Sequence, residues 1–349
     1  MEFSRFLYER TDVEASFINS LLKRKKSETL FWISELFLSG WKEQTVTLLW
    51  QVYYDFYYIY HSKLERKIHT LLTKSTDLKS VMTVATTLYY LKHKTTHCFE
   101  MRLLAKKITI PSVNFIYKSI PSKYDIFKNK HFILSIKKKH IINIAYYFQQ
   151  EGLALCDVYS DVKKLLNLKK FRIHHTNKNI EEHMVMALIS KYSVLSKPAS
   201  IREQSKHSLF HIETSLLKEL ADIKAMRPYR ILGEHRKYEI DDDIGLDHFS
   251  LARFRTQAYE NSVAYNMYYH WEYYAFKTPL WEERFNKYGG IQNHLIKEVE
   301  FPSEEKTEAF YKIYAYDPDE QSSVTDRKST KSISEISYEK WLQLVFQTD

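Results

Sequence analysis

The chain has 349 residues, of which 44% are hydrophobic, so it is long enough and apolar enough to build a sizeable core in one or two domains. It contains only 6 glycines and 7 prolines, which disfavours glycine-rich phosphate loops and turn-rich β-sandwiches, because both need unusual backbone conformations. The two cysteines, Cys98 and Cys156, exclude a disulfide framework, and the opening residues show no apolar run of a secretion signal.

The first forty residues predict two helices. Thr11 and Glu14 stand at the spacing of a capping box, so a helix is expected over 12–24. Ser27 is the expected cap of a second helix, over 27–39. Helices joined by such short links are typical of a helical bundle or array.

Residues 28–60 are rich in aromatic side chains, and three interpretations compete: a membrane span, an aromatic surface that stacks bases, or buried helices. Glu35 and Asp55 interrupt the apolar sequence and leave it too short for a membrane span. Gly40 follows an apolar run, where a left-handed residue commonly ends a helix. Apolar residues then recur at helical spacing over 44–60 and predict a buried central helix. Base stacking stays open for the outer tyrosines of this helix.

Helical patterns alternate with links along the rest of the chain. Pro111 and Pro121 bound a stretch that is typical of an extended connection, residues 196–210 form a second link, and 317–332 form a polar loop. Helices are expected over 63–74, 76–94, 137–152, 157–170, 180–195, 208–226, 258–276, 301–316 and 332–346.

These elements predict a mainly α fold, an irregular multi-helix bundle or array with a less regular C-terminal part. The expected divisions are a helical N-terminal domain over 1–107, an extended connection over 108–130 and a second helical region over 131–239. An acidic, aromatic-rich region over 240–349 is expected to pack on the rest as one compact unit. No sequence repeat of fixed length is found.

Charge is distributed unevenly along the chain. Residues 1–150 contain 24 Lys and Arg against 12 Asp and Glu, a net charge of +12. Residues 151–239 contain 16 against 11, a net charge of +5, and residues 240–349 contain 12 against 20, a net charge of −8. The candidate nucleic-acid-binding residues are the two basic runs Lys23, Arg24, Lys25 and Lys26, and Lys137, Lys138 and Lys139. Two alternatives stay open: the runs are solvated helix ends, or the acidic C-terminal part docks on the basic N-terminal half.

The sequence contains no glycine-rich nucleotide-binding motif, no nucleophile elbow and no paired cysteines of a zinc site. Three groups of side chains have the residue types of metal or acid–base sites, but each is predicted to be structural because no partner motif completes it. The first group is a set of histidines, His207 with His211, and His174–His175 with Glu182–His183. The second group is Asp241–Asp243, and the third is Asp317, Asp319 and Glu320. We therefore predict no catalytic residue, no metal site and no cofactor.

Two parts of the chain carry a resemblance to known proteins. They are RFLYERTDVEASFINSLLKRKKSETLFWISELFLSGW, residues 5–41, and YYHWEYYAFKTPLWEERFNKYGG, residues 268–290, followed by FYKIYAYDPDEQ, residues 310–321. Together they resemble an uncharacterised protein family of the nucleocytoplasmic large DNA viruses, the giant viruses of marseillevirus and mimivirus type. The resemblance implies a virus-encoded protein in the host cytoplasm or viral factory, or packaged in the virion. It carries over no activity, and residues 100–230 show no matching motif.

Three hypotheses of function follow. The favoured one is a non-enzymatic helical protein whose basic N-terminal half binds DNA, RNA or a nucleoprotein complex. The second is a virion structural or scaffolding protein that contacts other viral proteins through exposed apolar patches. The third is an enzyme without a recognisable motif, which would show a pocket with convergent polar groups and perturbed pKa values. No membrane partner is expected, and the oligomeric state stays open.

Overall fold

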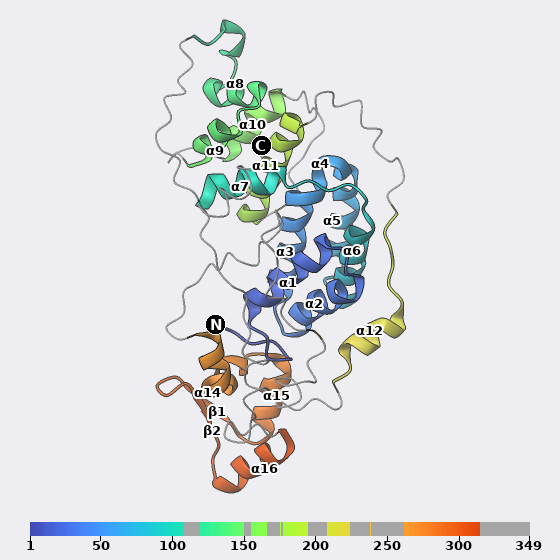
Figure 1. Ribbon diagram of the computed structural model, residues 1–349, viewed down its shortest axis with the longest axis vertical. Coiled ribbons are helices and arrows are strands. Elements are labelled where there is room, and N and C mark those ends of the chain that lie inside the picture. The colour runs from blue at the N-terminus through green and yellow to red at the C-terminus, as the bar shows by residue number, and fades with distance from the viewer. Residues whose placement is uncertain are drawn as a thin grey trace. The chain divides into compact units, whose positions relative to one another are not determined.

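The computed structural model describes residues 1–107, 119–149, 155–165, 175, 177–194, 208–223, 238 and 262–314. Most of these residues lie in helices, and the strands among them form one two-stranded antiparallel sheet (Figure 1). The prediction of a mainly α fold is therefore confirmed. Within these ranges, none of the helices combines the length and the apolar character that crossing a bilayer requires.

The chain divides into two compact units, and each unit joins segments that are distant in sequence. Unit 1 comprises Met1–Val46, Thr76–Tyr89 and Phe210–Asp349, and unit 2 comprises Thr47–Ser75 and Tyr90–Leu209. The predicted boundaries at 107/108 and 239/240 adjoin or fall among residues outside the described ranges, so the predicted division stays a prediction.

Unit 1 contains two groups of elements. The first group consists of α1 (Arg10–Leu22), α2 (Lys26–Leu38), the start of α3 (Lys42–Val52), α6 (Leu78–Tyr90) and α12 (Thr214–Ala221). The second group consists of α14 (Val263–Ala275), α15 (Pro279–Lys287), the hairpin strands β1 (Ile291–Asn293) and β2 (Glu298–Glu300), and α16 (Glu304–Tyr314). In the first group α2 contacts both α1 and α12, and in the second α14 contacts both α15 and β2.

The two helices predicted in the first forty residues are confirmed as α1 and α2, but both predicted caps are wrong. Glu9 is the N-cap of α1, and its carboxylate accepts hydrogen bonds from the backbone N–H groups of Thr11 (2.8 Å) and Asp12 (3.1 Å). At α2 the N-cap is Lys25 instead of Ser27, and no side chain caps the helix. An acidic side chain at the start of α1 also interacts favourably with the helix dipole.

The second group of unit 1 is built around an aromatic core that includes the N-terminal segment of the chain. Phe3 and Leu7 are buried in this core, and the Phe3 backbone N–H donates to the carbonyl oxygen of Tyr274 (3.1 Å). In Figure 1 the N-terminus accordingly lies beside α14. The other buried members are Val263, Met267, Trp271, Ala275, Trp281, Phe285, Tyr288 and Phe310. Residues about 270 positions apart therefore share one hydrophobic core, and its burial holds the N-terminal segment in place.

Gly40 is predicted to end a helix, and the structure confirms this, with a φ of +95° directly after α2. A Cβ at this position would lie 3.0 Å from Cδ and 3.2 Å from Cγ of Pro279. We expect Gly40→Ala to lower the free energy of unfolding by about 2 kcal/mol, because it adds both backbone strain and a steric contact. Urea denaturation measures the change.

The control separates the two causes of this destabilisation. In a Pro279→Ala background, Gly40→Ala is expected to cost less, because the steric contact is absent while the backbone strain remains. Equal costs in both backgrounds would contradict the role of the proline contact. If Gly40→Ala left the free energy of unfolding unchanged in the Pro279→Ala background, the expected backbone strain would be contradicted as well.

Unit 2 surrounds a central helix, α11 (Lys178–Val194). Residues 184–189 of this helix are all buried, which is typical of a helix that is covered on several sides. Helix α11 contacts α4, α7, α8, α10 and the π-helical segment Tyr53–Tyr57. The other helices of the unit are α4 (Tyr58–His61), α5 (Glu65–Lys74), α7 (His97–Lys107), α8 (Lys130–Lys138), α9 (Ile141–Gln149) and α10 (Leu155–Leu165).

The aromatic stretch near residue 50 is a buried helix, as predicted. Tyr53, Tyr54, Tyr57 and Tyr58 are each no more than 2% exposed, so they are not available to stack bases. The predicted continuous helix over 44–60 contains a π-helical turn, and the Phe56 carbonyl accepts a hydrogen bond from the backbone N–H of Thr95 (2.9 Å). These tyrosines therefore form part of the core of unit 2.

Several predicted elements need correction. The helix predicted over 137–152 begins only at Ile141, and residues 137–138 end the preceding helix, α8, which was not predicted. The helix predicted over 208–226 begins only at Thr214, because the Phe210 backbone N–H donates instead to Oγ1 of Thr87 (3.0 Å). Helices α7 and α15 and the β1–β2 hairpin were not predicted either. The loop at 317–332 and the helix at 332–346 lie outside the described residues.

Candidate functional site

The first basic run forms the turn between α1 and α2, which we name the first basic corner (residues 23–26). Lys23 is the C-cap of α1, Arg24 has a φ of +59°, and Lys25 is the N-cap of α2. Nη1 of Arg24 donates to the carbonyl oxygen of Tyr89 (3.4 Å), and the Tyr89 hydroxyl donates to the Arg24 carbonyl oxygen (3.2 Å). Lys23 is half-buried and the other three side chains are exposed, and Nζ of Lys25 forms an ion pair with Oε1 of Glu28 (3.2 Å). The corner is therefore anchored while its side chains remain accessible to solvent.

The second basic run ends α8 in unit 2, and we name it the second basic corner (residues 137–139). Lys137 and Lys138 lie in the last turn of α8, and Lys139 has a φ of +60°. The Lys139 backbone N–H donates to the Ile136 carbonyl (3.1 Å), and Nζ of Lys137 lies 5.2 Å from the ring centroid of Tyr192. All three lysines are exposed. Cations at this end of a helix also interact favourably with its dipole.

Both corners place a charged side chain in a backbone conformation that favours glycine. Arg24 and Lys139 follow helix ends with φ near +60°, where glycine is the usual residue because it has no Cβ. A residue with a side chain costs about 1–2 kcal/mol in this conformation. Leu7 and Lys297 have the same conformation outside the two corners. In each corner the cation therefore lies at a position where a side chain costs stability, which is one property of functional sites. The structure brings together the residues within each run, and the two corners belong to different units.

A polar cleft in unit 1 was not predicted from the sequence. Its volume is about 470 Å³, and its lining residues are Met1, Glu2, Glu9, Arg10, Tyr273, Tyr274, Lys277, Gln292 and His294. Glu2 and Arg10 form an ion pair, and the Tyr273 hydroxyl lies 3.1 Å from Nδ1 of His294. Next to the lining, burial raises the pKa of Glu14 to about 7, and Arg10 partly offsets this effect. No sequence motif indicated the cleft, because its two sides are more than 260 residues apart.

A second unpredicted cluster of polar groups lies inside unit 2. The hydroxyl of Tyr54 is 2.7 Å from Oε1 of Glu65 and 2.7 Å from Nε2 of His175. Burial raises the pKa of Glu65 to about 7, and the Tyr54 hydrogen bond and the charge of Lys191 offset only part of that rise. Burial and the Glu65 charge also raise the pKa of the Tyr54 hydroxyl. Glu65 is therefore close to half-protonated at neutral pH, unlike a solvent-exposed glutamate.

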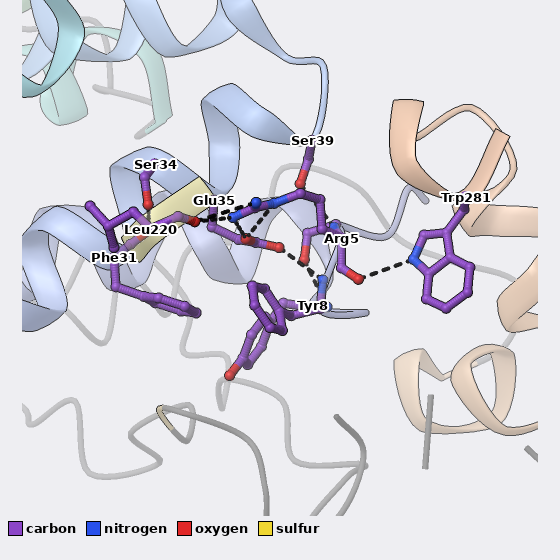
Figure 2. A network of polar contacts seen from close by, with 10 residues as sticks. Arg5, Tyr8, Phe31, Ser34, Glu35, Ser39, Leu220 and Trp281 are labelled. Carbon is purple, nitrogen blue, oxygen red and sulfur yellow. Dashed lines mark hydrogen bonds and ion pairs between the residues drawn. The ribbon is translucent and has the colours of Figure 1, made fainter. Parts of the chain in front are cut away.

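A buried ion pair joins three segments of unit 1 (Figure 2). Nη2 and Nε of Arg5 lie 2.7 and 3.1 Å from Oε2 of Glu35, and the guanidinium also donates to the Leu220 carbonyl oxygen. The backbone of Arg5 is held as well, because its N–H donates to Oγ of Ser39 and its carbonyl oxygen accepts from Nε1 of Trp281. Both charged side chains are almost fully buried and partnered, so this network is structural.

The histidine and carboxylate groups considered from the sequence do not assemble in the described part of the chain. His211 is exposed, whereas His183 is buried with Nδ1 2.7 Å from the Asn179 carbonyl of its own helix. His175 contacts Tyr54. His174, His207, Asp241–Asp243, Asp317, Asp319 and Glu320 lie outside the described residues. Among the residues that the structure describes, no group of three or more His, Cys, Asp or Glu side chains could hold a metal ion.

Comparisons with known proteins do not assign the chain to a family. No protein-family model matches it, no curated protein is similar to it, and no solved structure matches its fold. The resemblance to a giant-virus family therefore stays a prediction from the quoted stretches.

Proposed function

We propose that this protein is a non-enzymatic, virus-encoded helical protein that binds nucleic acid through its two basic corners. The observation that supports the proposal most is the placement of Arg24 and Lys139, two exposed cations, at left-handed positions that would favour glycine. The resemblance of the two end stretches to a giant-virus family adds the expected setting, the host cytoplasm or viral factory. The nucleic acid would then be viral DNA or RNA, free or in a nucleoprotein complex.

The kind of binding follows from the side chains that the corners present. Exposed lysines and arginines on an anchored turn suit the evenly spaced phosphates of a nucleic-acid backbone. The tyrosines of the 53–60 stretch, which could have stacked on bases, are mostly buried in unit 2. The proposal is therefore binding of backbone phosphates with little dependence on base sequence.

The test is binding to double- and single-stranded DNA and RNA over a salt series. We expect affinity to fall steeply with salt, and charge reversal of Lys137, Lys138 and Lys139 to glutamate should reduce the salt slope by about one for each phosphate contact that is lost. The matched control reverses Lys63, Arg66 and Lys67, three exposed cations elsewhere in unit 2. Equal losses in both variants, or no binding at low salt, would contradict the proposal.

A glycine substitution separates the stability of a corner from its binding. Lys139→Gly is expected to raise the free energy of unfolding by about 0.5–1 kcal/mol, because it relieves the left-handed strain, while it weakens binding to nucleic acid. Urea denaturation and the salt series are run on the same variant. Lys138→Gly is the control, since it removes the same charge from a helical position and should lower stability. Unchanged binding by Lys139→Gly would argue against a functional reason for the lysine.

The alternative function is a virion structural or scaffolding protein, and one observation favours it. In the second group of unit 1, large apolar side chains face solvent: Ile291 is 72% exposed, Leu295 93% and Tyr269 54%. Exposed apolar side chains that gather on one surface are typical of protein–protein contacts, here with other viral proteins. Stable oligomers that dissociate on Leu295→Asp, together with salt-independent behaviour toward DNA, would favour this alternative.

A further inference from the structure

The polar cleft of unit 1 is held open by hydrogen bonds on both of its sides. On one side the Arg10 backbone N–H donates to the Glu2 carbonyl (3.0 Å). On the other side the Gln292 amide donates to the Tyr273 carbonyl (2.8 Å). The Phe3 backbone N–H then joins the two sides through the Tyr274 carbonyl (3.1 Å). The cleft therefore exists before a ligand arrives, and its volume of about 470 Å³ lies within the range of small-molecule sites.

The two carboxylates of the lining already have partners in the protein. Oε2 of Glu9 accepts the backbone N–H groups at the start of α1, and Oε2 of Glu2 pairs with Arg10. The nitrogen atoms of the opposite side are available to a ligand. Lys277 is exposed and has no partner among the described residues, and only Nδ1 of His294 is engaged, by Tyr273. The available groups are thus hydrogen-bond donors and a cation, which favour an anionic ligand.

The rest of the lining indicates what carries the anionic group. The rings of Tyr273 and Tyr274 lie edge to face with their centroids 5.1 Å apart, and both line the cleft. Tyrosine rings provide a wall for a flat, apolar group, and the amide oxygen of Gln292 and Oε1 of Glu2 can accept hydrogen bonds from hydroxyl groups. We infer that this cleft binds a nucleoside phosphomonoester, with the phosphate at Lys277 and His294 and the base against the tyrosines.

This phosphomonoester has two chemical sources, a free mononucleotide and the 5′-phosphorylated end of a nucleic-acid strand. The inference does not depend on the proposed function, because its residues are separate from both basic corners. Calorimetric titration of the full chain with AMP, UMP, adenosine and inorganic phosphate tests the site. Short oligonucleotides with and without a 5′-phosphate distinguish the two sources.

We expect saturable binding of AMP or UMP, weaker binding of adenosine, and about a tenfold loss of nucleotide affinity in Lys277→Gln. Lys312→Gln, which removes another exposed lysine, in α16, is the matched control and should leave nucleotide affinity unchanged. His294→Gln should weaken binding as well, and thermal unfolding of each variant checks that it is folded. Preference for the 5′-phosphorylated strand over the 5′-hydroxyl strand would assign the strand end as ligand.

Two results would overturn the inference. One is the absence of saturable binding by every phosphomonoester probe, and the other is nucleotide binding that Lys277→Gln and His294→Gln leave unchanged. Charge reversal at residues 137–139 provides the separation from the proposed function, since it should weaken salt-dependent binding of long DNA and leave mononucleotide affinity intact. Loss of both activities in that variant would also count against a separate site.

Discussion

Replacing Arg5 by methionine is expected to lower the free energy of unfolding by about 3–5 kcal/mol, the largest effect that we expect from one substitution. The reason is that the negative charge of Glu35 would remain buried without its counter-ion. Glu35 is 0% exposed, and in the variant its carboxylate would keep only the backbone N–H of Phe6 (2.9 Å) as a partner at this site. Burying an ion without its counter-ion costs several kcal/mol, because the lost hydration is not replaced.

The matched control is Arg10→Met, which removes an arginine that lies 3.7 Å from Oε1 of Glu14 and forms an ion pair with Glu2. That pair is partly exposed, with 27% and 38% of the two side chains accessible, so its loss should cost no more than about 1 kcal/mol. Urea denaturation of both variants gives the comparison. A cost below about 1 kcal/mol for Arg5→Met would show that the buried pair adds little to the fold.

A double variant separates the cost of an unpaired charge from the value of the pair. Arg5→Met combined with Glu35→Leu removes both charges and keeps apolar volume in the same place. We expect it to be more stable than Arg5→Met alone, because apolar replacements of buried ion pairs are often nearly neutral. The Phe6 and Leu220 backbone groups lose their side-chain partners, so recovery should be incomplete.

Glu65→Gln is expected to stabilise the protein at pH 8 by about 3 kcal/mol and to leave its stability at pH 4.5 almost unchanged. Burial raises the pKa of Glu65 from 4.5 to about 7 in the folded protein. Between these values the folded chain holds a proton that the unfolded chain has released. The free energy of unfolding therefore falls as the pH rises from 4.5 through 7, and above that the ionised carboxylate destabilises the fold. Glutamine keeps an oxygen that accepts from Tyr54 and carries no charge.

The measurement is the free energy of unfolding by urea at several pH values between 4.5 and 8. Asp125→Asn is the control, since that carboxylate is 59% exposed and its charge costs little in the folded state. Burial also raises the pKa of Glu14 and Glu272 to about 7, so the parent protein and both variants should retain part of the pH dependence. Parallel pH profiles for the parent and Glu65→Gln would contradict a buried, partly protonated Glu65.

Sequence patterns predicted most of the described helices from their apolar spacing and missed α7, α8 and α15. Helix α8 was missed because the basic residues at its end were assigned to the next helix. The predicted cap of α1 was wrong for a tertiary reason, since the chain before α1 is hydrogen-bonded to α14 and Glu9 takes the cap position. The exposure of the basic runs followed from their composition, because lysine and arginine are rarely buried.

The sequence alone determined that this protein is mainly helical and favoured a buried helix near residue 50, whereas the structure decided that Tyr53, Tyr54, Tyr57 and Tyr58 are buried and that both basic runs lie at helix ends. The predicted properties depend on hydrogen bonds and side-chain periodicity within a few turns of the chain. Only the tertiary structure decided that Phe3 enters a core with Trp271 and Trp281, that Arg5 pairs with Glu35, and that Arg10 and His294 line the same cleft. Such contacts join residues up to about 280 positions apart, and they depend on which helix faces pack against each other. A local sequence pattern does not contain this information.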